Sequence, residues 1–134
     1  MSGETDIKKL LQGVKPKLNA GEFVYCTVES FQHANVLNPL CMFQEAEAVT
    51  VILSREQADD ASLPSSVVCA WITLTVHSSL EAVGLTAAVS KALTEANISC
   101  NVVAAYYHDH IFVPVKDAKR AMDVLENLSK QETH

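Results

Sequence analysis

The second half of the chain has the more regular pattern of apolar and polar positions. Val67–His77 is a long, β-branched and nearly continuous apolar run, which predicts a central strand covered on at least one face. Apolar residues then recur at helical spacing, which predicts an amphipathic helix that packs on a sheet and ends at Asn97. These apolar positions are Leu85, Ala88, Val89, Ala92, Leu93 and Ala96.

A hairpin and a second helix follow this helix. Ile98–Tyr107 and His110–Val115 predict two strands that turn at His108-Asp109. Tyr106 and Tyr107 would then point to opposite faces of a strand, one in the core and one at an interface. The last helix has its apolar positions at Ala118, Ala121, Met122, Leu125 and Leu128.

The second half therefore reads strand, helix, strand, strand, helix. This order predicts an α+β fold of the ferredoxin-like βαββαβ type, which needs a fourth strand. The polar tail Gln131–His134 is too short to supply that strand, so we predict that Glu22–Val28 does. Such an exchange makes the two halves interdependent, and we expect one cooperative body.

The first half has the same kinds of element with weaker signals. Apolar residues at helical spacing up to Val14 predict a short helix, and Lys15 and Lys17 are interpreted as its solvated end. Later segments predict a strand, a hairpin and a helix capped by Ser54. These segments are Glu22–Val28, then Cys41–Glu45 with Ala48–Leu53, then Ser54–Asp60.

A weak internal sequence similarity indicates that the unit of the second half is duplicated in the first half. Cys26–Ser30 is similar to Leu74–Ser78, but residues 29–39 have weak periodicity and are treated as a connection. The first half thus lacks a clear counterpart of the helix at Leu85–Ala96. We divide the chain into a degenerate N-terminal half, residues 1–66, and a C-terminal domain, residues 67–134.

Charge and composition limit the classes of function. The 134 residues carry a formal net charge of −6, and the few Lys and Arg residues are scattered, which argues against nucleic-acid binding. No segment approaches the ~20 apolar residues that span a bilayer, and the N-terminus is polar and acidic, so we expect a cytoplasmic protein. The four cysteines form no CxxC pair and lie in apolar surroundings, which favours buried reduced thiols.

The stretch from Val83 to Val103, followed by His110-Ile-Phe-Val-Pro114 and an amphipathic helix, resembles the regulatory ACT domain of aspartate kinases. It is also similar to the ACT repeats of cytosolic arginine sensors. The whole chain resembles a group of small tandem-ACT bacterial proteins described as uncharacterised. This resemblance, good over Trp71–Leu128, implies a tandem or interlocked pair of ACT-type folds and a free-standing sensor or regulator that binds an amino acid at an interface.

The loop ahead of Leu85 is the candidate ligand site. Gly84 lets the backbone approach a ligand closely, and the amides that open the helix suit a carboxylate. The resemblance implies a ligand at this turn, to which the next strand would supply backbone groups and the Asn101 amide. An ordinary helix cap explains the same turn, and one reading does not exclude the other. The predicted ligand-binding residues are His77, Ser78, Ser79, Leu80, Glu81, Ala82, Val83, Gly84, Leu85, Asn101, Val102 and Val103.

Metal binding and catalysis have weaker support. His108 and His110 are two apart on a strand and would share a face, but no Cys or carboxylate cluster completes a ligand set, so we predict a polar turn and no metal. Because the chain has no GxSxG, no phosphate loop and no paired carboxylates, we predict no catalytic residues, no cofactor and no enzyme.

Two hypotheses about function follow. The first is a regulatory protein that binds an amino acid or a similar small zwitterion and forms a homodimer. The alternative is an ACT-like interaction or oligomerisation module that has lost its ligand, which predicts an exposed apolar patch.

Overall fold

The structure is a computed structural model that describes residues 11–75 and 84–130. The chain divides into two compact units. Unit 2 spans Gly21–Cys69, and unit 1 combines the residues up to Ala20 with those from Ala70 onward. Unit 2 is therefore an insertion in the chain of unit 1. The predicted division at residues 66 and 67 stays a prediction about domain boundaries.

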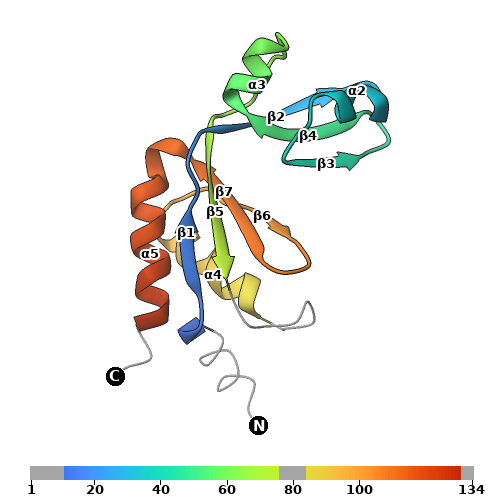
Figure 1. Ribbon diagram of the computed structural model, residues 1–134. Helices are drawn as coiled ribbons and strands as arrows, with labels where there is room; N and C mark the ends of the chain where they lie inside the picture. The colour runs from blue at the N-terminus through green and yellow to red at the C-terminus, as the bar shows by residue number, and fades with distance from the viewer. Residues whose placement is uncertain (1–10, 76–83, 131–134) are drawn as a thin grey trace. The chain divides into compact units, whose positions relative to one another are not determined.

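Unit 1 is a sheet with its helices on one face (Figure 1). Among the described residues, its strands follow the order β1-β5-β7-β6. The strands are β1 (Lys15–Leu18), β5 (Cys69–Thr75), β6 (Asn101–Ala104) and β7 (Asp109–Pro114). The helices are α4 (Leu85–Glu95) and α5 (Ala118–Lys130), and the 3-10 turn η1 (Val115–Asp117) leads into α5.

The core of unit 1 lies between this sheet and the two helices. Alternate residues of β5 and β7 face the helices because side chains along a strand alternate between its two faces. The apolar stripe predicted for α4 is confirmed, and Asn97 after the helix has the left-handed φ of 60°. The buried residues of this core include Ala70, Ile72, Leu74, Leu85, Val89, Leu93, Ile111, Val113, Ala121, Leu125 and Leu128.

The fourth strand of unit 1 is β1, so the prediction that Glu22–Val28 supplies it was wrong. β1 pairs antiparallel with β5 from Lys15↔Thr75 to Leu18↔Ile72. The interpretation of Lys15 and Lys17 as a solvated helix end was therefore also wrong. Pro16 explains the error, because proline ends helices but is also accepted in an edge strand, where its missing N–H is not needed.

Unit 2 repeats the arrangement on a smaller scale. Its strands follow the order β3-β4-β2, and the predicted hairpin and capped helix are confirmed. Ser54 accepts a hydrogen bond from the Gln57 N–H, while the Gln57 side chain accepts one from the Ser54 N–H. The elements are β2 (Phe23–Val28), α2 (Phe31–Val36), β3 (Cys41–Gln44), β4 (Val49–Ser54) and α3 (Arg55–Asp60).

Two sequence interpretations of unit 2 need correction. β2 pairs with β4 along its whole length, from Phe23↔Ser54 to Val28↔Val49, so it is an integral strand of unit 2. Residues 29–39 contain the helix α2, which is the counterpart of α4 that the first half was expected to lack. The helix was missed because it has only six residues and one buried position, Ala34, too few to create a period.

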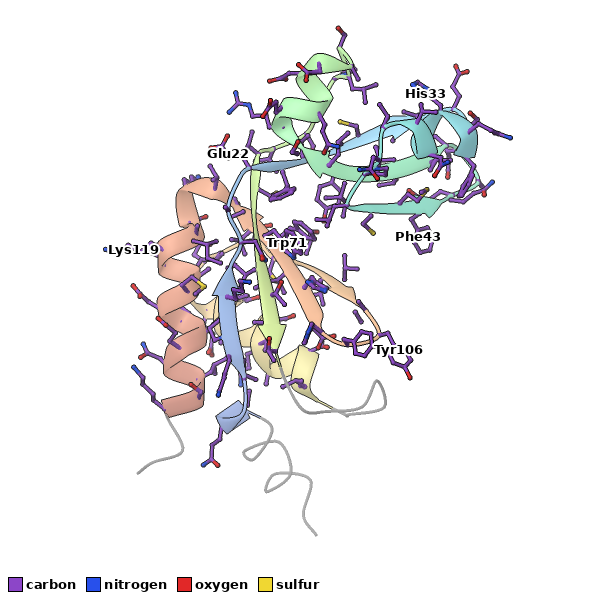
Figure 2. All side chains as sticks on the ribbon, viewed as in Figure 1. Glu22, His33, Phe43, Trp71, Tyr106 and Lys119 are labelled. Carbon is purple, nitrogen blue, oxygen red and sulfur yellow. The ribbon has the colours of Figure 1, made fainter. Side chains whose placement is uncertain are left out.

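The β6–β7 hairpin turns earlier than predicted. Its turn is closed by a hydrogen bond from the Ala105 N–H to the His108 carbonyl, so Tyr106 and Tyr107 lie in the turn and not in a strand. Both residues are about 80% exposed, and their rings contact each other edge to face. Figure 2 shows Tyr106 at the tip of the hairpin. The prediction that one of them lies in the core was wrong. The predicted α+β, ferredoxin-like fold class is confirmed.

Candidate functional site

Gly84, the residue directly before α4, sets the backbone geometry at the start of this helix. Gly84 has φ 91° and ψ −11°, a left-handed conformation that glycine adopts without strain. The Ala88 N–H donates to the Gly84 carbonyl at 2.9 Å and starts the helical hydrogen bonds. The amides of the first turn precede this bond and have no helical partner, and glycine has no side chain to cap them. The turn therefore presents N–H donors at the positive end of the helix dipole.

The structure describes only part of the predicted site. His77–Val83 lie outside the described residues, while Gly84, Leu85 and Asn101–Val103 lie within them. The Leu85 side chain is buried in the core of unit 1, and Val102 packs against that core. These two residues can therefore offer a ligand only backbone groups.

Asn101 and Val103 lie on the opposite face of the sheet, away from the helices. The register pairs Asn101 with Phe112 and Val103 with His110. Asn101 is exposed, and β6 is an edge strand of unit 1. β5 and β6 run in the same direction, toward the end of the sheet where α4 begins (Figure 1). Asn101 is the first residue of β6, so it lies at the opposite end of the sheet. The fold thus brings the last residues of β6, and not Asn101, toward the Gly84 turn.

A polar cluster that sequence reasoning missed lies on the same helix-free face. The Trp71 indole N–H donates to His110 Nδ1 at 3.0 Å, and Thr73 Oγ1 lies 3.2 Å from the same nitrogen. Asn19 Nδ2 donates to Thr73 Oγ1 at 2.9 Å and to the Trp71 carbonyl at 3.2 Å. We call these four residues the Trp71–His110 cluster. The signal was present in β5, where Trp71 and Thr73 alternate with the core residue Ile72.

Hydrogen bonding determines the tautomer of His110. An indole N–H can only donate, so Nδ1 of His110 must be the unprotonated nitrogen and Nε2 carries the proton. Burial lowers the pKa of His110, the neighbouring His108 lowers it further, and Asp109 acts in the opposite direction. In this tautomer Nε2 has no lone pair to offer a metal. Within the described ranges, no group of three His, Cys, Asp or Glu side chains could hold a metal ion.

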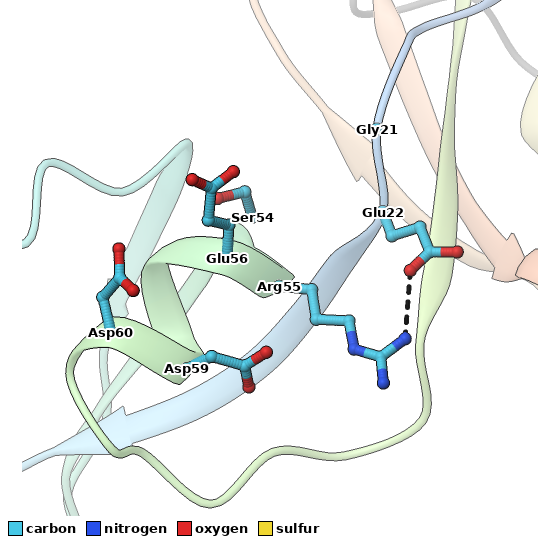
Figure 3. Close-up of a pocket in the computed structure, with 7 residues that line it drawn as sticks. All are labelled: Gly21, Glu22, Ser54, Arg55, Glu56, Asp59 and Asp60. Carbon is cyan, nitrogen blue, oxygen red and sulfur yellow. Dashed lines mark hydrogen bonds and ion pairs between the residues drawn. The ribbon is translucent and has the colours of Figure 1, made fainter.

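Unit 2 contains a shallow hollow of about 450 Å³ beside α3 (Figure 3). Arg55 Nη1 pairs with Glu22 Oε1 at 3.1 Å across it, but both side chains are about half exposed, and such surface pairs contribute at most about 1 kcal/mol. The remaining charged groups are all carboxylates. The hollow is lined by Gly21, Glu22, Ser54, Arg55, Glu56, Asp59 and Asp60. This open acidic surface lacks the enclosed, mixed lining that a small-molecule site needs.

Comparison with known proteins gives the family. Two models of the ACT domain match the chain, one over residues 2–70 and one over residues 66–127. The chain belongs to the ACT-domain family. A search of curated proteins found no match.

Solved structures share the fold of this chain. A Vibrio cholerae protein of unknown function, described as a possible transport protein, is 46% identical, with a TM-score of 0.89 over 96% of this chain and 99% of its own. The regulatory subunit of aspartate kinase from Thermus flavus has a TM-score of 0.60 at 10% identity, over 87% of this chain and 96% of its own. A Clostridium acetobutylicum aspartate kinase has a TM-score of 0.65 at 11% identity, over 87% of this chain and 34% of its own.

Membership of the ACT-domain family supports a regulatory, small-molecule-binding role, and the aspartate kinase neighbours share the fold. The two ACT-domain matches follow one another along the chain, which agrees with the tandem arrangement predicted from the sequence. Within residues 11–75 and 84–130, no helix is long and apolar enough to cross a membrane.

Proposed function

We propose that this ACT protein is a cytoplasmic regulator that binds a free amino acid and has no catalytic activity of its own. The observation that carries the proposal is the turn at Gly84, where a left-handed glycine opens α4 and, among the described residues, no side chain caps the first amides of the helix. A carboxylate is the natural partner of such amides, because they combine hydrogen-bond donors with the positive end of the helix dipole.

The equivalent turn in unit 2 argues for one site per chain, in unit 1. There the Ser30 side chain accepts a hydrogen bond from the His33 N–H at 3.1 Å and caps α2 itself. Only Glu29 and Ser30 separate β2 from α2, so that turn is short as well as capped. At the start of α4, by contrast, Gly84 is the N-cap, and no side chain of the described residues caps the helix. The contacts assigned to His77–Val83 remain part of the prediction.

A homodimer would complete this site. Asn101 starts β6, at the end of that strand far from the Gly84 turn of its own chain, and the outer edge of β6 has free backbone groups within the described part of unit 1. If two copies paired their β6 edges antiparallel, Asn101 of one copy would lie beside Ala104 of the other. The Asn101 amide would then approach the Gly84 turn of the second copy, where it could bond the zwitterion.

A thermal-shift screen of the full chain against the twenty amino acids tests the proposal. A ligand of the folded state at about 100 times its Kd adds about 2.7 kcal/mol to the free energy of unfolding, which raises Tm clearly. Gly84→Ala should abolish that rise. Gly21→Ala is a matched control, because Gly21 has a similar φ of 100° but lies in unit 2, and its added Cβ would make only ordinary contacts.

Both substitutions should lower the basal Tm by similar amounts, since each forces an L-residue into a left-handed conformation at a cost of about 1–2 kcal/mol. Only Gly84→Ala should lose the response to the ligand. No rise in Tm with any amino acid, or equal loss in both variants, would refute the proposal.

The alternative function, an interaction module without a ligand, draws its support from the hairpin tip. Tyr106 and Tyr107 form an exposed aromatic pair, and aromatic residues of this kind are common at protein interfaces. This alternative predicts that Tyr106→Ser with Tyr107→Ser leaves Tm unchanged and abolishes self-association or partner binding. If the double variant still associates as the wild type does in sedimentation, the tip is not an interface.

A further inference from the structure

The Trp71–His110 cluster lies where the chain passes between the two units. The chain leaves unit 1 after Ala20 and returns to it at Ala70. Asn19 is the neighbour of Ala20 at the first crossing, and Trp71 is the neighbour of Ala70 at the second. The Asn19 N–H donates to the Trp71 carbonyl at 2.9 Å, and the Asn19 side chain donates to the same carbonyl at 3.2 Å. Trp71 therefore holds both crossings side by side within unit 1.

His110 in turn holds the Trp71 side chain. Its Nδ1 accepts the indole N–H at 3.0 Å and lies 3.2 Å from the Thr73 hydroxyl, which can donate to it while accepting from Asn19. The two rings lie 5.7 Å apart between centroids. One polar chain thus joins the end of β1 to β5 and β7, and a single nitrogen of His110 is its acceptor.

We propose that the Trp71–His110 cluster is a proton-sensitive clamp on the two crossings between the units. When a proton from solvent binds Nδ1, that nitrogen changes from acceptor to donor, and the imidazolium N–H faces the indole N–H. Two donors cannot share a hydrogen bond, so the Trp71–His110 bond must break. Thr73 can accept from the imidazolium by rotating its hydroxyl, but the indole has no such freedom. Trp71 must shift, and its carbonyl loosens its hold on Asn19.

The charges around His110 allow this change at mildly acidic pH. On its own strand and turn, the ionisable neighbours are Asp109 and His108, whose ring centroid lies 6.3 Å from that of His110. The residue of β6 opposite His110 is the apolar Val103. β5 contributes no charge to this face of the cluster, and β1 contributes Lys17, paired with Thr73, and Lys15, paired with Thr75. Both lysines and His108 disfavour a positive charge on His110, and among these neighbours only Asp109 favours it. The clamp should therefore open below the ordinary imidazole pKa of about 6.5.

Tryptophan fluorescence tests the clamp directly, because Trp71 is the only tryptophan of the chain. The emission of the full-length wild type should change through one titration step, with its midpoint below about pH 6.5. His110→Gln should remove the step, since glutamine does not titrate. His108→Gln, a matched control on the same hairpin, should keep the step. A step that survives in His110→Gln would overturn the proposal, as would no step in the wild type.

NMR tests the clamp on the wild-type protein, so the test does not depend on whether a variant folds. The nitrogen shifts of His110 should report the tautomer protonated at Nε2 above the step, and the Trp71 indole proton should move upfield as the step is crossed. Relaxation of the backbone nitrogens should give rotational correlation times for units 1 and 2 that diverge further below the step than above it. A Nδ1-protonated His110 at neutral pH, or correlation times that do not respond to the step, would overturn the clamp. These results do not depend on any amino acid binding at Gly84.

Discussion

The insertion of unit 2 between β1 and β5 predicts that the stability of unit 1 depends on unit 2 being folded. β1 pairs with β5 from Lys15↔Thr75 to Leu18↔Ile72, and roughly 50 residues of unit 2 lie between the two strands. When unit 2 is folded, its ends are held together by the pairing Phe23↔Cys69. The β1–β5 pair then closes a loop that behaves as if only about five residues long. Unfolding unit 2 lengthens that loop tenfold, which costs about 2 kcal/mol at (3/2)RT per logarithmic unit of length.

Leu53→Ala is the perturbation that tests this coupling. Leu53 is fully buried in the core of unit 2, so the substitution loses about 2.4 kcal/mol of transfer free energy for three carbons, plus a cavity term, about 3–4 kcal/mol in total. A unit of this size rarely has more than about 3–5 kcal/mol of stability, so unit 2 should be largely unfolded in the variant. Urea unfolding followed by Trp71 fluorescence reports unit 1, and circular dichroism reports the whole chain.

The expected result is that the Trp71-reported free energy of unfolding falls by about 2 kcal/mol although the substitution is in unit 2. Leu40→Ala is the control, because Leu40 lies in unit 2 but is 41% exposed, and it should change either signal by less than about 1 kcal/mol. If circular dichroism reports the loss of unit 2 while the Trp71 transition stays within about 0.5 kcal/mol of the wild type, the reasoning from loop closure is wrong.

Three further predictions concern single residues. Ser54→Ala removes the capping box of α3 and should lower the free energy of unfolding by about 1 kcal/mol in urea; a loss below about 0.3 kcal/mol would mean that the cap contributes little. Burial raises the pKa of the Cys100 thiol from 9.0 to about 11, so its rate of alkylation, followed by mass spectrometry, should keep rising up to about pH 11, and a plateau near pH 9 would contradict this. Because the pKa of His110 is lower in the folded than in the unfolded chain, the unfolded state takes up the proton first; stability is therefore complete above about pH 6.5 and is lost as the pH falls toward the folded-state pKa. His110→Gln should remove this part of the pH dependence of chemical unfolding, and equal slopes in wild type and variant would refute the assignment.

Elements with long, regular periods were predictable from the sequence. The stripe from Leu85 to Ala96 became α4 because eleven helical residues bury Leu85, Val89 and Leu93 on one face. The capping box at Ser54 was also readable, since its geometry depends only on residues within one turn. Local chemistry and repeated burial leave a signal that needs no knowledge of distant contacts.

Elements that depend on distant partners were not predictable. β1 has four residues and contains Pro16, and only its pairing with β5, more than 50 positions away, makes it a strand. The Trp71–His110 cluster joins residues 39 positions apart, and Asn19 is farther still from Thr73. Tyr106 and Tyr107 have high strand propensity, yet the register of β6 with β7 assigns them to the turn. In the candidate site, the glycine turn could be inferred, but the direction of β6, which separates Asn101 from that turn within one chain, could not.

Amide chemical-shift mapping with the amino acid that raises Tm most tests the central claim most directly. Added to the ¹⁵N-labelled full chain, that amino acid should shift the resonances of Gly84, Leu85 and Asn101–Val103 in a saturable way, while the amides of unit 2 stay unchanged. Two results would contradict the account. One is a set of shifts confined to the hollow beside α3, and the other is the absence of a saturable shift at both the Gly84 turn and β6.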